Sequence, residues 1–530
     1  MRERNFIVKQ ALFLAVFFVL QLLLSGKLKG QNFDYCKESK IEYSKPIVYD
    51  TSNVVVFWNG QSTMFKFAPS FKTENKSWLL NEPIRYFFDA FSYANNNHYT
   101  FYSDNATVSL QPIWDALPEG LVYLKIEAQT TVSNRRVLVA ERNFTKAAAF
   151  CPPYPPAKYG YSEAFARGLS FMYNQAHVQA WLSESQPNHR LHPIYCYSAL
   201  EVGSVINAMV LYHRHFPENE SSIIIARKAA DYLISQSEAG EAPLAGFPQV
   251  YEGDQLAAAR FHDEIILTEP AATAQSYLLL FDETGDSTYL GAALRIAGVY
   301  KKTQLENGTW HIRLSKTTGL PTTQVLCIPM KIINFLQLLV EKYHYTEYQQ
   351  IIDPAISWTF ENPVKTLDWT GQFEDVEAVK PYQNLTKYEA SWFAQYLLKH
   401  YESTTKQFEL AKQLINFCED QFVVWEQPAI YDNWGNSSQN WHVPAVLEQY
   451  NCYVPIDASA VQMIDTYYLA WQKTGNYLYL EKAKTLANSL VNTQEQDGRI
   501  PTFWAEGFDE FWNNCMVSSL MMLEKMKETE

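Results

Sequence analysis

The sequence predicts a mostly helical chain, in which a closed ring of six helical hairpins follows a small β-sandwich. The first observation is a repeat: residues 284–310 and 474–500 align without a gap, and Thr284-Gly285 recurs 190 positions later as Thr474-Gly475. The segment 151–530 is twice as long as this offset, so six hairpins of about 63 residues fit into it. The second observation is that apolar residues alternate before residue 150 and recur with a helical period of about 3.6 after it. The third is a set of long polar loops at about hairpin spacing.

The first 30 residues have the pattern of a secretory signal peptide. Basic residues among the first nine precede an apolar run from Ala11 to Leu24, and small residues such as Ser25 follow it. We therefore expect a periplasmic or secreted protein. An uncleaved membrane anchor is the alternative, because residues 6–24 are nearly long enough to span a bilayer.

Residues 31–150 predict the β-sandwich. About seven short runs of strand-forming residues are separated by turn residues, which is typical of such a domain. In one of them Val122, Leu124 and Ile126 alternate with a tyrosine, a lysine and a glutamate, as in a half-buried strand. Four prolines within residues 152–156 then stop any regular element, so we place a domain boundary at Cys151.

Residues 151–530 predict the ring. Helical segments joined by short turns pack antiparallel, and in a closed ring the loops at alternate turns meet at one end. Long loops in a compact domain usually carry function. Five polar, aromatic segments therefore predict one site at the mouth of the ring: 239–265, 307–323, 367–386, 425–457 and 498–514.

Composition excludes several classes of protein. The formal net charge is −14, which argues against nucleic acid as a partner. Seven cysteines in a chain of 530 residues do not make a disulfide scaffold. The sequence has no CxxC pair and no HExxH, GxSxG, Walker or dinucleotide-binding motif, so we expect no metal and no cofactor.

A β-domain, a proline-rich joint and a six-hairpin repeat together resemble the (α/α)6-toroid carbohydrate-active enzymes. That superfamily includes glucuronyl hydrolases, polysaccharide lyases and uronyl epimerases. The resemblance covers about residues 40–530, and the segments 371–376 and 441–450 look like signature segments. It implies an (α/α)6 toroid that acts on a poly- or oligosaccharide outside the cytoplasm, and we transfer no catalytic residue from it.

Glu374 and Asp375 are the first candidate catalytic residues. They lie in the 367–386 loop, and glycoside hydrolysis needs one protonated and one ionised carboxyl group. The alternative is a helix cap or a salt bridge, because adjacent acids are common in loops.

The segment 431–457 is the richest in acids and aromatic rings. Proton-transfer candidates are His442, Glu448 and Tyr453. The candidates for sugar binding, through ring stacking or hydrogen bonds, are Tyr431, Asp432, Trp434 and Trp441. We expect residues 443–449 to begin a helix with Pro444 in its first turn, and His442, Glu448, Asp375 and Tyr453 to share one site. The alternative is a loop held by buried tryptophans.

Four further residues are candidates for substrate binding. Arg260 and His262 could hold a substrate carboxylate, although a solvated charged face is the alternative. Trp504 and Trp512 suit a sugar-binding rim. Trp310 is equivalent to Ile500 in the repeat, which favours a packing role for it.

These residues predict an exported enzyme that hydrolyses glycosidic bonds of an acidic, uronic-acid-containing glycan. The first alternative is a lyase in which Tyr453, Tyr431 or His442 abstracts the C5 proton of a uronic acid. The second is a carbohydrate-binding protein without catalytic activity.

Overall fold

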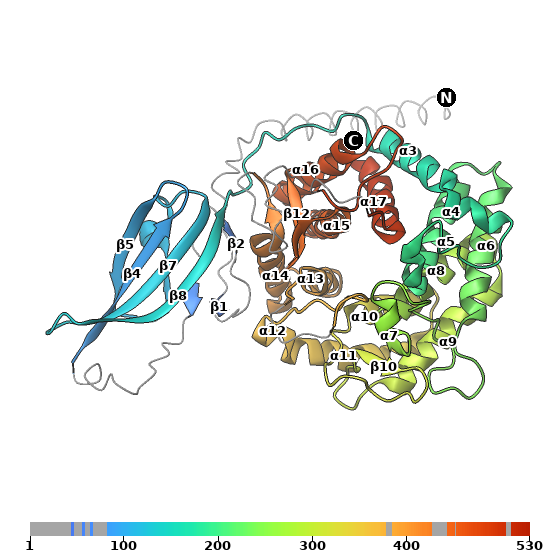
Figure 1. The fold of residues 1–530 in the computed structure, drawn as a ribbon, viewed down its shortest axis with the longest axis horizontal. Coiled ribbons are helices and arrows are strands. Elements are labelled where there is room, and N and C mark those ends of the chain that lie inside the picture. The colour runs from blue at the N-terminus through green and yellow to red at the C-terminus, as the bar shows by residue number, and fades with distance from the viewer. Residues whose placement is uncertain are drawn as a thin grey trace, which may run out of the picture.

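A computed structural model describes residues 44–46, 56–58, 64–66, 82–105, 107–377, 384–426, 442–450, 452–504 and 510–530. It shows a β-rich N-terminal part beside a ring of helices (Figure 1). The predicted fold class, a mostly helical (α/α)6 toroid preceded by a small β-sandwich, is confirmed.

The N-terminal part contains two sheets. The larger has the order β2-β8-β7-β4-β5 and the smaller has the order β1-β3-β6. The strands of the larger sheet are β2 (Val56–Trp58), β4 (Ile84–Ser92), β5 (Asn97–Ser103), β7 (Gly120–Thr130) and β8 (Arg136–Ala147). Those of the smaller are β1 (Ser44–Pro46), β3 (Met64–Lys66) and β6 (Thr107–Ser109).

The alternation predicted for residues 120–128 places one row of side chains in the core. Val122, Leu124 and Ile126 are buried on β7, and Ile126 pairs with the buried Phe88 of β4. Trp114, on the short helix α2 (Gln111–Trp114), is buried and stacks on Phe144 of β8, so it packs against the sheet.

The helices form two concentric rings (Figure 1). The inner ring consists of α5 (Ser198–His215), α8 (Glu269–Thr284), α10 (Met330–Glu341), α13 (Tyr388–His400), α15 (Asp457–Thr474) and α17 (Asn513–Met526). The outer ring consists of α3 (Tyr161–Asn174), α6 (Glu220–Ser235), α9 (Ser287–Thr303), α11 (Gln349–Glu361), α14 (Lys406–Phe422) and α16 (Tyr477–Thr493). The ring closes because α17 packs against both α3 and α5.

All inner helices begin at the same end of the ring, because each follows an outer helix that runs in the opposite direction. We call this the loop end. Its long connections carry the short elements α4 (Ala176–Gln179), α7 (Ala258–Phe261), β9 (Glu264–Ile266), β10 (Arg313–Ser315), α12 (Pro363–Thr366), β11 (Val423–Val424), β12 (Ala445–Gln449) and β13 (Cys452–Pro455).

The sequence repeat is confirmed as a structural repeat. Thr284 and Thr474 each end an inner helix, on α8 and α15, which lie three hairpins apart in the ring. Gly285 and Gly475 follow them with the same left-handed φ of 68° and cap these helices.

The second turn of the repeat also matches in both copies. A Cβ atom at Gly308 would lie 2.3 Å from the carbonyl oxygen of Pro354, and one at Gly498 would lie 2.4 Å from that of Arg167. Both partners belong to the next outer helix, so glycine is needed for close packing between neighbouring hairpins. Trp310 is fully buried, and its indole donates to the carbonyl of Tyr300, which agrees with a packing role.

The helix expected at residues 443–449 is wrong. Ala445–Gln449 instead form β12, which pairs antiparallel with β11 and β13. The run has the apolar, partly β-branched composition of a buried strand, and the neighbouring strands satisfy its backbone groups. His442 therefore does not lie at a helix N-terminus.

Three other expectations concern the domain boundary, the N-terminal residues and the cysteines. The last strand of the N-terminal sheets, β8, ends at Ala147, and α3 begins at Tyr161. The domain division at Cys151 stays a prediction. Residues 1–30 lie outside the described residues; within the described part of the chain, no helix combines the length and apolar character needed to cross a membrane. Cys151 is disulfide-bonded. Among the described residues, the cysteines outside a disulfide are Cys196, Cys327, Cys418, Cys452 and Cys515, and all five are buried.

Candidate active site

Asp375 lies where loops from several sides of the ring meet. Burial and then the charge of Asp375 raise the pKa of Tyr197, which precedes α5, and that of Glu448, which lies on β12 before α15. The pKa of Asp375 is itself raised by burial, lowered by its own backbone amide and by Arg313, and raised by Glu510. These groups come from connections that lead into different inner helices. The side chain of Asp375 still reaches solvent, as a group at the mouth of the ring should.

Glu374 is the buried neighbour of Asp375. It is 8% exposed, and burial raises its pKa well above the usual value, with Glu269 and Asp375 adding to the rise and Lys331 opposing it. Lys331 is engaged by Glu269, since its Nζ lies 2.8 Å from Glu269 Oε1. The surroundings of Glu374 therefore favour its protonated form.

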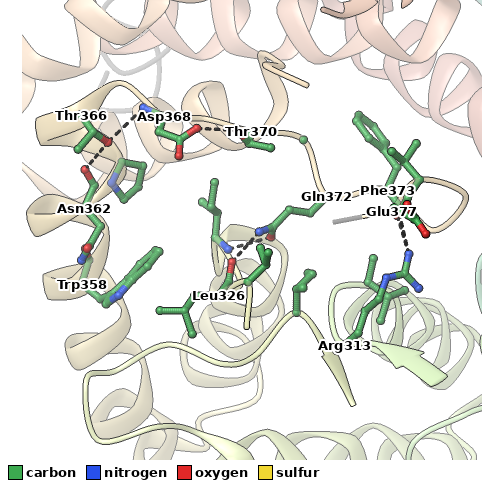
Figure 2. A pocket seen from close by; sticks show the side chains of 17 residues that line it. Arg313, Leu326, Trp358, Asn362, Thr366, Asp368, Thr370, Gln372, Phe373 and Glu377 are labelled. Carbon is green, nitrogen blue, oxygen red and sulfur yellow. Dashed lines mark hydrogen bonds between the residues drawn. The ribbon is translucent and has the colours of Figure 1, made fainter. Parts of the chain in front are cut away.

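Arg313 holds the loop that carries these two acids. Its Nη2 donates to the carbonyl oxygens of Phe373, Glu374 and Val376, at 3.2, 3.1 and 3.0 Å. Its Nη1 donates to the hydroxyl of Tyr251 at 2.6 Å, and that hydroxyl donates to the Glu374 carbonyl at 2.7 Å. Figure 2 shows the guanidinium directed at this loop. A buried guanidinium with so many acceptors fixes the backbone geometry of the loop.

Gln372 anchors the other side of the same loop. Its Oε1 accepts a hydrogen bond from the amide of Ile328 at 2.8 Å, and its Nε2 donates to the carbonyl of Leu326 at 2.7 Å (Figure 2). Beside it lies a pocket of about 340 Å³, whose walls include Trp358 and Phe373. Glu374, Asp375 and Glu448 do not line this pocket, so its role is separate from theirs.

Lys387 is the basic partner of Glu448. Its Nζ donates to the backbone carbonyl of Glu448 at 2.8 Å and to the hydroxyl of Ser459. Burial lowers the pKa of Lys387 to about 7, and the charge of Glu448 opposes this shift. Burial raises the pKa of Glu448 to about 7; the charge of Asp375 adds to the rise and that of Lys387 opposes it. Glu448 is therefore a carboxyl group that can give up or take a proton near neutral pH.

The structure thus brings together Glu374, Asp375 and Glu448 from the predicted catalytic residues. His442 is exposed at the start of the segment that leads into β12. The side chain of Tyr453 lies outside the described residues, as do Tyr431, Asp432, Trp434 and Trp441. The catalytic roles stay predictions.

Of the two predicted rim tryptophans, only Trp512 lies near the acids. Its ring stacks on that of Tyr197, with 5.3 Å between the ring centroids. Burial and then the charge of Asp375 raise the pKa of Tyr197. Trp504 is 3% exposed, and its amide donates to the carbonyl of Pro455; its expected place at a sugar-binding rim stays a prediction.

Arg260 and His262 lie on the exposed side of the loop end. Arg260 forms an ion pair with Glu377, so its charge is already engaged by the acid-bearing loop. His262 is exposed on the connection that follows α7. The expected contact with a substrate carboxylate stays a prediction for both.

Arg313, Tyr251, Lys387 and Glu510 were missed as parts of the site. Each is a single polar residue in a loop, on a short strand or at a helix start, and only the closed ring places it beside the acids. Within the described residues, no three His, Cys, Asp or Glu side chains are placed to hold a metal ion together.

No family model matches the sequence, and no curated protein matches it. Solved structures with a similar arrangement include a family 76 glycoside hydrolase from a bovine strain of Bacteroides thetaiotaomicron, at 12% identity over 84% of this chain and 94% of that one, with a TM-score of 0.42. A cellobiose 2-epimerase from Spirochaeta thermophila has 8% identity over 70% and 98% of the two chains, with a TM-score of 0.48. An unsaturated glucuronyl hydrolase specific for heparin has 11% identity over 70% and 97%, with a TM-score of 0.45. At this level of similarity, the function has to be argued from the site itself.

Proposed function

We propose that this protein is an exported glycoside hydrolase in which Asp375 and Glu448 carry out the reaction. The observation that supports it is that the charge of Asp375 raises the pKa of Glu448, which comes from a different loop. Asp375 is the more solvent-accessible acid, and Arg313 favours its ionised form against the opposing effects of burial and Glu510, whereas Glu448 has a pKa of about 7. One ionised and one protonated carboxyl group are what glycosidic bond hydrolysis requires.

In this proposal Glu448 donates its proton to the glycosidic oxygen that leaves. Asp375 acts on the opposite side of the sugar, either on water as a general base or on the anomeric carbon as a nucleophile. Glu374 is buried and its raised pKa disfavours the ionised form, so Asp375 is the better candidate for the anion.

The charges around Asp375 favour an uncharged sugar over the uronic acid expected from the sequence. Asp375 and Glu510 are acids, and their negative charges would repel a substrate carboxylate. The nearby arginines are engaged: Arg313 by the loop backbone and Arg260 by Glu377.

The disulfide at Cys151 supports export, because such bonds persist in oxidising compartments outside the cytoplasm. Together with the signal-like residues 1–30, it favours a periplasmic or secreted location.

A panel of purified polysaccharides tests the proposal. The wild-type protein should release reducing ends from at least one uncharged glycan, such as a mannan, glucan or xylan, with no gain in ultraviolet absorbance. Glu448→Gln should lower turnover by about 10²-fold or more, because it keeps the shape of the side chain but removes the proton donor.

Three results would contradict the proposal. Products from a uronic-acid glycan with a new ultraviolet absorbance would identify a lyase. Binding of a glycan without release of any reducing ends would identify a carbohydrate-binding protein. Full turnover by Glu448→Gln would exclude Glu448 as the acid.

A further inference from the structure

A groove of about 750 Å³ opens at the loop end of the ring, beside the acid-bearing loop. It lies between residues 186–189, residues 249–254 and Lys316, so loops from neighbouring hairpins form its walls. Its size is in the range of a small-molecule binding site, and its lining is rich in amide, carboxylate and imidazole groups.

Glu252 is the most specific feature of this groove. Its carboxyl group is 12% exposed; Oε2 accepts a hydrogen bond from the hydroxyl of Tyr232 at 2.8 Å and lies 3.5 Å from Nε2 of His189. The other oxygen, Oε1, is buried and has no hydrogen-bond partner in the protein. A buried carboxylate oxygen without a donor is costly, and a small turn of the Glu252 side chain toward the groove would let a ligand hydroxyl supply that donor.

Tyr251 connects this groove to the acids. It forms part of the groove wall, and its hydroxyl donates to the carbonyl of Glu374 and accepts from Arg313. The groove wall and the acid-bearing loop are therefore held as one unit, and a chain-like ligand that reaches Asp375 can continue into the groove.

We infer that this groove is a glycan subsite, which binds a sugar unit of the substrate away from the cleaved bond, with Glu252 accepting hydrogen bonds from sugar hydroxyl groups. The inference rests on the proposed hydrolase function. Sugar hydroxyls supply the donors that Glu252 lacks, and the amides of Gln236 and Gln249 both donate and accept, which suits an uncharged glycan.

Calorimetric titration with hexasaccharides of mannose, glucose and xylose tests the subsite when it is carried out in the Glu448→Gln background, in which cleavage is slow. At least one hexasaccharide should bind, and adding Glu252→Ala should weaken this binding by about 10-fold or more, as expected when a hydrogen bond to a charged group is lost. Glu241→Ala is the matched control: it removes an exposed acid that does not line the groove, and binding should change by less than about 2-fold.

Kinetics separate this inference from the proposed function. On a hexasaccharide, Glu252→Ala should lower kcat/KM by about 10-fold or more, and on the nitrophenyl monoglycoside of the same sugar it should match the wild type. Equal losses on both substrates, or unchanged hexasaccharide binding in a variant with the wild-type Tm, would overturn the subsite. Binding that depends on Glu252 without any cleavage would leave the subsite standing and overturn the hydrolase.

Discussion

The acids in the loops and the acids at the starts of the inner helices have similar pKa shifts but different surroundings. Asp375 and Glu448 lie on connections that meet at the loop end, and Asp375 is exposed. Glu389 and Asp457 lie in the first turns of α13 and α15; burial raises the pKa of each to about 8. Glu389 is almost fully buried, and Asp457 completely so.

The helix-start acids join one part of the ring to the next. Asp457 accepts a hydrogen bond from Ser519 on α17 at 2.9 Å, and Glu269 pairs with Lys331 on α10. Glu201 on α5 accepts from His192 at 2.8 Å and from the amide of Asn513 at 3.1 Å. A raised pKa therefore does not by itself identify a catalytic acid; access to solvent and the meeting of several loops separate the two groups.

Among variants that keep both proposed catalytic acids, the largest effect on activity is expected when the loop that carries Asp375 loses its hydrogen bonds to Arg313. Arg313→Met removes all the hydrogen bonds that its guanidinium donates to the loop carbonyls and to Tyr251. We expect kcat to fall by about 10 to 10²-fold, because small displacements of catalytic groups are costly, and Tm to fall as well. Steady-state kinetics and thermal unfolding measure both.

Arg260→Met is the matched control for this change. It removes an exposed arginine that pairs with Glu377 on the same loop, and kcat should stay within about 2-fold of the wild type. If Arg313→Met and Arg260→Met had equal kcat values, the hydrogen bonds that Arg313 donates to the loop would have no catalytic importance.

A smaller effect is expected from Lys387→Met, which acts on Glu448 through charge. The charge of Lys387 lowers the pKa of Glu448, so its removal should raise that pKa. If Glu448 acts as the protonated group, the alkaline limb of the kcat profile should move to higher pH by roughly one unit. If the alkaline limb of the kcat profile did not move, its pKa would belong to a group other than Glu448.

The smallest effect on activity is expected at a helix-start acid. In the folded chain the carboxyl group of Glu389 has a pKa of about 8, whereas in the unfolded chain its pKa lies near the usual value of 4.5. Between these values the unfolded state binds fewer protons, so the free energy of unfolding of the wild type falls as the pH rises. Glu389→Gln removes this dependence and should be more stable than the wild type by about 1–3 kcal/mol at pH 8.

Urea unfolding at pH 5 and pH 8 measures the difference, and kcat should be unchanged. A large loss of turnover in Glu389→Gln would remove the distinction between the two groups of acids.

Most of the fold could be predicted because its signals are local or repeated. The apolar period and the repeated turns at Thr284 and Thr474 led to the correct ring of hairpins. The strand at residues 445–449 could not be predicted in this way, since its partner strands β11 and β13 are supplied by the fold. The burial of Trp504 was missed for the same reason.

For the site, the order of residues indicated which loops carry acids and that these loops lie at one end of a ring. The closed ring was needed to show that the charge of Asp375 raises the pKa of Glu448, that Arg313 fixes the loop of Asp375, and that Glu252 Oε1 has no hydrogen-bond partner in the protein. The difference lies in how far along the chain each signal extends. Helical periodicity and turn chemistry depend on a few neighbouring residues, whereas burial, pKa and hydrogen-bond partners depend on groups that meet only when the ring closes.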